Sequence, residues 1–298
     1  RGIALTPVKF GISFTLTHLN QAGALVHVYQ DGSVHLNHGG TEMGQGLFQK
    51  VAQVAAEEFG IGLERVHITA ASTDKVPNTS PTAASAGTDL NGMAVQQAVR
   101  EIKARLARFA AESWNVEGDR ISFRDDRVFI GNESIPFGEL TKKAYAARVH
   151  LSAAGFYKTP KLHWDREKAK GRPFFYYAYG AACSEVVIDI LTGEMSVRRV
   201  DILHDVGRSI NPAIDIGQIE GAFVQGMGWL TTEELVYDEE GRLLTHAPST
   251  YKIPVAADVP ADFHVALFDG SNREETIYQS KAVGEPPLML AISVFHAR

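Results

Sequence analysis

Apolar and polar residues alternate along residues 22–38, AGALVHVYQDGSVHLNH, on both sides of Asp31–Gly32. An Asp–Gly pair between two alternating stretches is the short-range signature of a β-hairpin with a two-residue turn. The period then changes, because apolar side chains recur at helical spacing from Leu47 to Phe59, and Gly60 follows where a helix would end. The pattern therefore predicts a hairpin and then an amphipathic helix.

The rest of the chain continues this mixture of strands and helices. The further predicted elements are a strand at 66–72, a helix at about 89–112, a hairpin at 121–130, a short helix at 137–147, a hairpin at 183–203, a helix at 217–230, a hairpin turning at Glu240–Gly241, a strand at 263–268 and a last helix from 285. We therefore expect an α+β fold of two lobes, each built from hairpins and helices packed on sheets.

The basic, proline-bearing stretch 156–173 is the best candidate for a boundary between the lobes. It divides the chain into a first lobe at 1–155 and a second lobe at 156–298. Each lobe then has a hairpin followed by a Gly–Gln pair at a predicted helix start, Gly44–Gln45 and Gly217–Gln218.

Composition excludes several classes of protein. With 45% hydrophobic and 21% charged residues the chain has enough apolar surface for a substantial core, and a net charge of −6 without a basic block argues against a nucleic-acid or anionic-membrane partner. The single cysteine, Cys183, leaves no CxxC pair for zinc or an iron–sulfur cluster and favours a reducing compartment.

No signal peptide or long apolar segment is present, so we expect a cytoplasmic location. The chain begins without Met and ends inside a predicted helix, so we expect a piece of a longer polypeptide.

Two stretches rich in small residues lead into helices. GGTEMGQG (39–46) has four glycines whose backbone N–H groups could approach an anionic or pterin-like ligand at a helix start, and a turn without any ligand is the alternative. SPTAASAGTDLNG (80–92) permits equally close approach, with Thr88 or Asp89 as the expected cap, and plain helix packing is its alternative. Neither stretch matches GxxxxGK[ST] or GxGxxG.

Three single residues are candidates for a catalytic or ligand-binding role. Glu285 stands between Gly284 and Pro286–Pro287, which places a carboxylate at a helix entrance; a surface residue that complements the helix dipole is the alternative. The Gln218 amide both donates and accepts, although a surface role suits it equally. An aromatic residue such as Phe14 is usually part of a core. The histidines show no metal-ligand spacing, and no GxSxG elbow is present.

Five motifs occur together and in order: KFGISFT (9–15), GGTEMGQG (39–46), SPTAASAGTD (80–89), NPAIDIGQIEGAFVQG (211–226) and KAVGEPPL (281–288). In this combination the chain resembles the molybdenum-binding part of the xanthine dehydrogenase family, essentially from end to end. It resembles the C-terminal part of the large molybdopterin subunit of a bacterial two-subunit enzyme, or the equivalent end of the single-chain eukaryotic form. The resemblance implies hydroxylation of hypoxanthine to xanthine and of xanthine to urate, at a molybdenum held by a pterin dithiolene and by no side chain.

The resemblance also assigns roles to individual residues. It makes Glu285 the general base; it places Met43, Gly44, Gln45, Ala84, Ser85 and Gln218 at the molybdopterin, and Phe14 and Thr15 at the purine. Gly87 departs from the pattern, because some relatives have a serine there. The family's other pocket-forming loops, its FAD and its 2Fe–2S clusters lie outside these 298 residues.

The intact enzyme is therefore expected to be a hetero-oligomer, in which the FAD and iron–sulfur subunit and the rest of the large subunit are partners. Two alternatives stay open. One is an aldehyde oxidase-like hydroxylase, which would differ in substrate residues mostly upstream. The other is a scaffold or assembly module that is inert in isolation.

Overall fold

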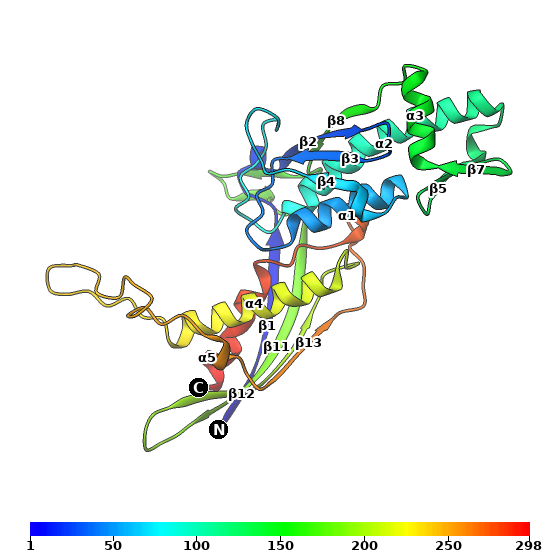
Figure 1. Cartoon of the computed structure of the whole chain (residues 1–298). Coiled ribbons are helices and arrows are strands. Elements are labelled where there is room, and N and C mark those ends of the chain that lie inside the picture. The colour runs from blue at the N-terminus through cyan, green and yellow to red at the C-terminus, as the bar shows by residue number, and fades with distance from the viewer. The chain divides into compact units, whose positions relative to one another are not determined.

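The structure is a computed structural model that describes all 298 residues. The chain forms two compact units, which are described separately here (Figure 1). The central unit comprises Ser13–Phe175, and the terminal unit comprises Arg1–Ile12 together with Tyr176–Arg298. None of the helices combines the length and the apolar character that crossing a bilayer requires.

The central unit is built on a four-stranded sheet of order β4-β3-β2-β8. Its strands are β2 (Gln21–Val28), β3 (Val34–His38), β4 (Val66–Ile68) and β8 (Ser152–Lys158). β2 and β3 form the predicted hairpin, with His27 opposite His35, but its loop is wider than a two-residue turn. The Tyr29 N–H donates to the Ser33 carbonyl over 2.9 Å and closes this loop. β4 is shorter than the strand expected at 66–72.

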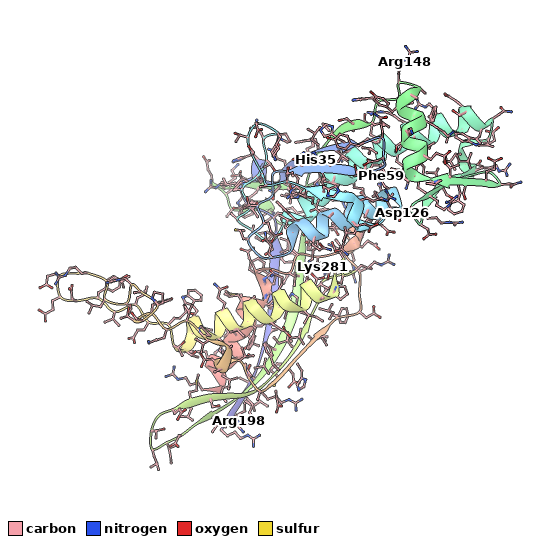
Figure 2. All side chains as sticks on the ribbon, in the orientation of Figure 1. His35, Phe59, Asp126, Arg148, Arg198 and Lys281 are labelled. Atoms are coloured by element: carbon pink, nitrogen blue, oxygen red, sulfur yellow. The ribbon has the colours of Figure 1, made fainter.

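Helices cover one face of this sheet. They are α1 (Leu47–Phe59) and α2 (Gly87–Trp114), whereas α3 (Phe137–Ala146) packs against α2 and against strands of a smaller sheet. α1 has the predicted bounds, since its apolar period ends at Gly60, whose φ of +68° suits a residue without a side chain. Phe59, labelled in Figure 2, packs against Phe137 with ring centroids 5.6 Å apart. α2 lies along β8 and β2, and a Cβ at Gly155 would stand 1.9 Å from the Ala94 carbonyl oxygen.

Two small sheets complete the central unit. One has the order β5-β6-β7, with β5 (Ile121–Arg124), β6 (Arg127–Ile130) and β7 (Glu133–Pro136); the other pairs β9 (His163–Asp165) with β10 (Lys170–Arg172). The predicted hairpin at 121–130 is confirmed, and Asp125 and Asp126 both take positive φ at its turn.

The terminal unit is a second four-stranded sheet, of order β1-β11-β12-β13, with helices on one face. Its elements are β1 (Gly2–Ile12), β11 (Tyr176–Ile188), β12 (Met195–His204), β13 (Asp262–Leu267), α4 (Pro212–Thr231), the 3₁₀ helix η6 (Pro286–Ala291) and α5 (Ile292–Ala297). The hairpin predicted at 183–203 is confirmed as β11 and β12. Its core joins strand residues such as Val200 to Phe223 of α4 and Leu290 of η6.

The boundary between the units differs from the one expected at residue 155. Residues 156–158 belong to β8, which pairs with β2, so the stretch is part of a sheet instead of a connector. The units divide between residues 175 and 176, and residues 1–12 join the C-terminal part of the chain. The physical reason is β1, which pairs with β11 from Gly2 to Ile12.

Two local predictions were wrong, and a third was right only for the turn. α4 begins at Pro212 and not at 217, because Asn211 caps it by accepting from the Ile214 N–H, so Gly217–Gln218 lies inside the helix. The cap of α2 is Ala86, and neither Thr88 nor Asp89 takes that position. The turn expected at Glu240–Gly241 is present, since the Asp238 N–H donates to the Arg242 carbonyl over 3.0 Å, but the flanking strands are reduced to a single bridge between Tyr237 and Leu243.

Candidate functional site

The two loops rich in small residues touch each other in the central unit. The Thr41 N–H donates to the Thr82 hydroxyl over 2.8 Å. Gly39 allows this approach, because a Cβ there would lie 1.9 Å from Cγ2 of Thr79. Loops 39–46 and 79–87, which are separate in the sequence, therefore form one wall.

Phe14 and Ala84 lie at the same small pocket beside this wall. The pocket is otherwise lined by Ala22, Thr79, Ser80, Pro81, Thr82, Ala86, Gly87, Leu90 and Asn91. The Phe14 backbone is fixed by Asn20, since its N–H donates to Asn20 Oδ1 (2.8 Å) and its carbonyl accepts from Asn20 Nδ2 (2.9 Å). Phe14 and Ser85 are partly exposed, and Thr15 is exposed. Two of the five sequence motifs, together with Phe14 and Thr15 of a third, thus lie in one unit.

The expected anion-binding end of α1 is occupied by a side chain of the loop itself. The Glu42 carboxylate accepts from the N–H groups of Gly44 (2.9 Å), Gly46 (3.0 Å) and Phe48 (2.9 Å). Gly46 has positive φ, so the chain turns around the carboxylate before the helix starts. The sequence left open whether a ligand or a plain turn uses these donors and did not point to Glu42, although an acid four residues before Gly46 was the available signal.

These hydrogen bonds also change the acidity of Glu42. Partial burial raises the pKa of its carboxyl group, but hydrogen bonds from the backbone of Phe48, Gly46, Gly44 and Met43 outweigh burial and lower it. Glu42 is therefore a carboxylate at neutral pH and stabilises the start of α1.

We expect Glu42→Ala to lower the free energy of unfolding of the chain by about 1–2 kcal/mol, because it leaves helix-start N–H groups without their acceptor. Urea titration followed by circular dichroism measures this loss. Glu112→Ala, at an exposed position of α2, is the matched control and should change stability by less than about 0.5 kcal/mol. Equal stability of the two variants would show that Glu42 does not cap the helix.

Met43, Gly44 and Gln45 form the exposed tip of this loop. Met43 is 66% exposed, and a Cβ at Gly44 would meet no atom within 4 Å. The Gln45 side chain folds back on the loop, since its Oε1 accepts from the Met43 N–H (2.5 Å) and its Nε2 donates to the Thr41 carbonyl (2.8 Å). The loop has a defined shape of its own, with open space on its outer side.

Two buried polar atoms near the wall have no hydrogen-bond partner within the chain, His38 Nε2 and Asn91 Oδ1. Asn91 is 4% exposed, lines the pocket with Phe14, and donates from Nδ2 to the Gly87 carbonyl. A buried acceptor without a donor is unfavourable, so a polar ligand or a water molecule suits this place. No sequence signal marked Asn91, because an Asn inside a helix is usually a surface residue.

The remaining two predicted site residues lie in the terminal unit. Gln218 is half-buried in the second turn of α4. Glu285 is exposed directly before η6, where Pro286 and Pro287 are buried and the Leu288 N–H donates to the Glu285 carbonyl (3.1 Å). The predicted site residues are thus divided between the two units, seven in the central unit and two in the terminal unit.

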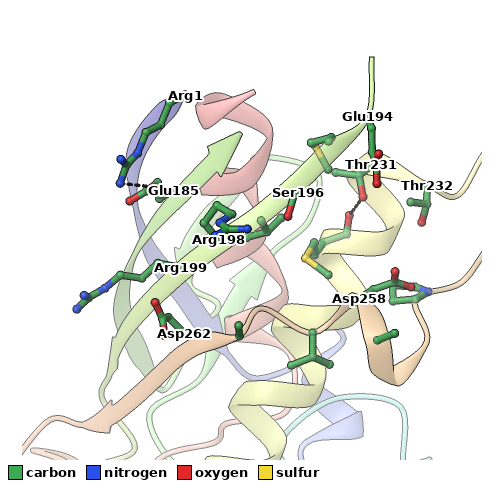
Figure 3. Close-up of a pocket in the computed structure, with 17 residues that line it drawn as sticks. Arg1, Glu185, Glu194, Ser196, Arg198, Arg199, Thr231, Thr232, Asp258 and Asp262 are labelled. Atoms are coloured by element: carbon green, nitrogen blue, oxygen red, sulfur yellow. Dashed lines mark hydrogen bonds and ion pairs between the residues drawn. The ribbon is translucent and has the colours of Figure 1, made fainter. Parts of the chain in front are cut away.

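A larger pocket of the terminal unit, about 640 Å³, contains none of the predicted residues (Figure 3). Two of the arginines that line it form ion pairs. Arg1 pairs with Glu185 over 2.6 Å, and Arg199 pairs with Asp201 over 2.7 Å.

No group of three or more His, Cys, Asp or Glu side chains in either unit is arranged to hold a metal ion.

Comparison with known proteins gives a consistent result. The family described as molybdopterin cofactor-binding domain matches residues 1–260. The chain is 53% identical over 297 residues to the xanthine dehydrogenase/oxidase of Mus musculus, covering 100% of this chain and 21% of that protein. It is 50% identical over 300 residues to the xanthine dehydrogenase of Dictyostelium discoideum, again 100% of this chain and 21% of the relative. The chain therefore spans about a fifth of the length of the curated relatives it matches.

A solved structure matches the α+β fold over nearly the whole chain. The crystal structure of quinoline 2-oxidoreductase from Pseudomonas putida 86 superposes with a TM-score of 0.85 and 24% sequence identity, and covers 99% of this chain and 38% of that one. This likeness concerns the fold. The expected α+β architecture with a molybdopterin-binding role is confirmed at the level of the family.

Proposed function

This chain belongs to the molybdopterin cofactor-binding domain family, and we propose that it is the segment of a xanthine dehydrogenase-type molybdenum hydroxylase that supplies the general base and part of the cofactor pocket. The observation that carries the proposal is the convergence of Phe14, loop 39–46 and loop 79–87 in one unit, held by the Thr41–Thr82 hydrogen bond.

The residues present suit the cofactor. The glycine at position 44 leaves space on the outer side of the loop, and Asn91 supplies a buried acceptor that lacks a donor. We assign Met43, Gly44, Gln45, Ala84 and Ser85 of the central unit, and Gln218 of the terminal unit, to holding it. When bound, the molybdenum–pterin group supplies the redox centre that takes two electrons from a purine and transfers an oxygen derived from water.

Glu42 refines this assignment. Because its carboxylate already accepts the helix-start N–H groups, a cofactor phosphate would meet the Gln45 side chain and the outer side of the loop instead of the end of α1. In this proposal Glu42 gives the loop its shape and does not contact the substrate.

The substrate roles fall to three residues. Glu285 takes a proton from the attacking oxygen, because it is the exposed carboxylate of the predicted set and stands on a short stretch between buried neighbours. Phe14 stacks against the purine ring, and Thr15 lies beside it. Exposure of Phe14 at a pocket edge supports the stacking role.

The proposal extends to the intact enzyme. It hydroxylates hypoxanthine to xanthine and xanthine to urate in the cytoplasm; FAD, 2Fe–2S clusters and the other pocket walls belong to the remaining four-fifths of the protein. The matched relatives named above are eukaryotic, so the bacterial two-subunit, hetero-oligomeric arrangement stays a prediction.

Purification of the intact protein tests this function. We expect about one molybdenum and one pterin per chain, measured by elemental analysis and by fluorescence of the oxidised pterin, together with urate formation from hypoxanthine. Oxidation of aldehydes with no turnover of purines would favour an aldehyde oxidase-like enzyme. Absence of molybdenum and pterin from the intact protein would favour a scaffold role and contradict the proposal.

A further inference from the structure

The stretch that carries Glu285 is anchored in the terminal unit by a buried ion pair four residues before it. The Lys281 ammonium lies 2.5 Å from Oδ2 of Asp205, and the two side chains are only 9% and 16% exposed (Lys281 is labelled in Figure 2). Asp205 directly follows β12, so the pair joins the end of this strand to the segment after η5 (Ile277–Gln279).

Both partners of this pair are held by further contacts. Lys281 Nζ also donates to the Tyr177 carbonyl over 3.1 Å and stands 5.3 Å from the centre of the Tyr179 ring. Oδ1 of Asp205 accepts from the Gly207 N–H over 2.9 Å, and the Asp205 N–H donates to the Tyr179 carbonyl over 2.8 Å. Neither side chain can shift without breaking more than one interaction.

The backbone on either side of Lys281 is fixed as well. The Lys281 N–H donates to the Val206 carbonyl over 2.7 Å, and the Ala282 N–H donates to the Tyr176 hydroxyl over 2.7 Å. Ala282 and the next residue, Val283, are buried. The chain is therefore immobilised up to two residues before Glu285.

The chain is equally fixed after Glu285. Pro286 and Pro287 are buried at the start of η6, and α4 packs so closely that a Cβ at Gly226 would lie 2.4 Å from the Leu288 carbonyl oxygen. Farther on, the Ser293 and Ser184 hydroxyls are 2.6 Å apart in the core. Glu285 is thus an exposed side chain on backbone that is held from both directions.

We propose that Lys281 and Asp205 are positioning residues for the Glu285 carboxylate, an inference that rests on the proposed function. A general base is effective only within hydrogen-bond reach of its proton, and a displacement of about 1 Å costs on the order of 10²-fold in rate. The buried pair provides that placement, because Asp205, the Tyr177 carbonyl and the Tyr179 ring hold the Lys281 ammonium four residues before Glu285, and the Gly207 N–H holds Asp205 in turn.

The test uses Lys281→Met in the intact enzyme, with Lys142→Met at an exposed position of α3 as the control. We expect kcat to fall by about 10²-fold while KM and the molybdenum and pterin content stay within about twofold. Amide hydrogen exchange of residues 282–288 should increase in the same variant. The double variant Lys281→Met/Asp205→Asn removes both charges and leaves no unpaired buried charge. Its free energy of unfolding should therefore be higher than that of Lys281→Met, while its kcat should stay as far below the wild-type value as that of the single variant.

A double-mutant cycle with Glu285→Gln separates positioning from general stability. If Lys281 acts through Glu285, Lys281→Met should change the residual kcat of Glu285→Gln by less than about twofold. A further 10²-fold loss in that background, a double-charge variant with wild-type kcat, or unchanged exchange of residues 282–288 would each overturn the proposal. Failure of the proposed function gives a different result. Glu285→Gln alone would then keep a near wild-type kcat, although amide hydrogen exchange of residues 282–288 would still increase in Lys281→Met.

Discussion

On the proposed function, replacing Glu285 with glutamine in the intact protein is expected to lower kcat for xanthine by on the order of 10³-fold, since the amide cannot accept the proton that a general base removes. Glutamine has nearly the same shape, and Glu285 is exposed before a buried Pro–Pro pair, so the fold should not change. Steady-state assays of urate formation measure the loss, and elemental analysis should find molybdenum still bound.

Glu220→Gln is the matched control for this experiment. Glu220 is an exposed glutamate on α4, in the same unit, and has no predicted role. Its variant should have wild-type kcat. If Glu285→Gln also forms urate at a rate within about threefold of the wild type, the assignment of the base is wrong.

Lowering the pH from about 7 to 5 is expected to destabilise both units well before most carboxylates are protonated. His38 in the central unit is 1% exposed and His204 in the terminal unit is fully buried. Burial lowers the pKa of each to about 4, and this outweighs the nearby acids that raise it, Glu42 for His38 and Asp205 and Asp215 for His204. The histidine pKa in the unfolded chain is about 6.5. Between about pH 6.5 and pH 4, therefore, the unfolded chain binds a proton at each of these histidines and the folded units do not.

The sign and size of the effect follow from this difference. Stability is independent of these histidines above about pH 7, falls as the pH drops below about 6.5, and decreases by roughly 1.4 kcal/mol per pH unit for each histidine, up to about 3 kcal/mol each near pH 4. Urea unfolding of the chain at a series of pH values measures the slope. His35 adds in the same direction, because burial and then His27, Lys75 and His67 lower its pKa.

Two variants identify the groups responsible. Replacing His204 with leucine should remove its share of the pH slope, whereas His246→Leu, at an exposed position, should leave the slope unchanged. A urea midpoint that does not vary between pH 7 and pH 5 would contradict the prediction.

Agreement between sequence and structure is best where the signal is local. The bounds of α1 follow from the apolar spacing between Leu47 and Phe59 and from Gly60, and the hairpins at 121–130 and 183–203 follow from alternation around their turns. The start of α4 was missed for a local reason too, because Asn211–Pro212 is itself a cap signal that the Gly–Gln pair obscured.

The candidate site likewise combines features that follow from local sequence with features that depend on long-range packing. The five motifs identified the family, and the structure places two of them, and the Phe14 end of a third, in the central unit. Spacing alone does not specify the Glu42 hydrogen bonds, since the carboxylate reaches Phe48 in a loop that turns through the positive φ of Gly44 and Gly46. The orphaned acceptor of Asn91 also depends on packing between loops that are distant in sequence.

The sequence by itself determined α1, the hairpins at 121–130 and 183–203, the α+β class and the family, because helical and strand periods and short motifs involve neighbouring residues. Only the tertiary structure decided which residues form each unit, since β1 pairs with β11 more than 160 residues away, and pairing at that separation leaves no mark in the local pattern. It also decided which side chains are buried, and therefore that Lys281 meets Asp205 and that His38 and His204 stay neutral. The short motifs identified the family, and long-range packing determined where the side chains of each unit lie.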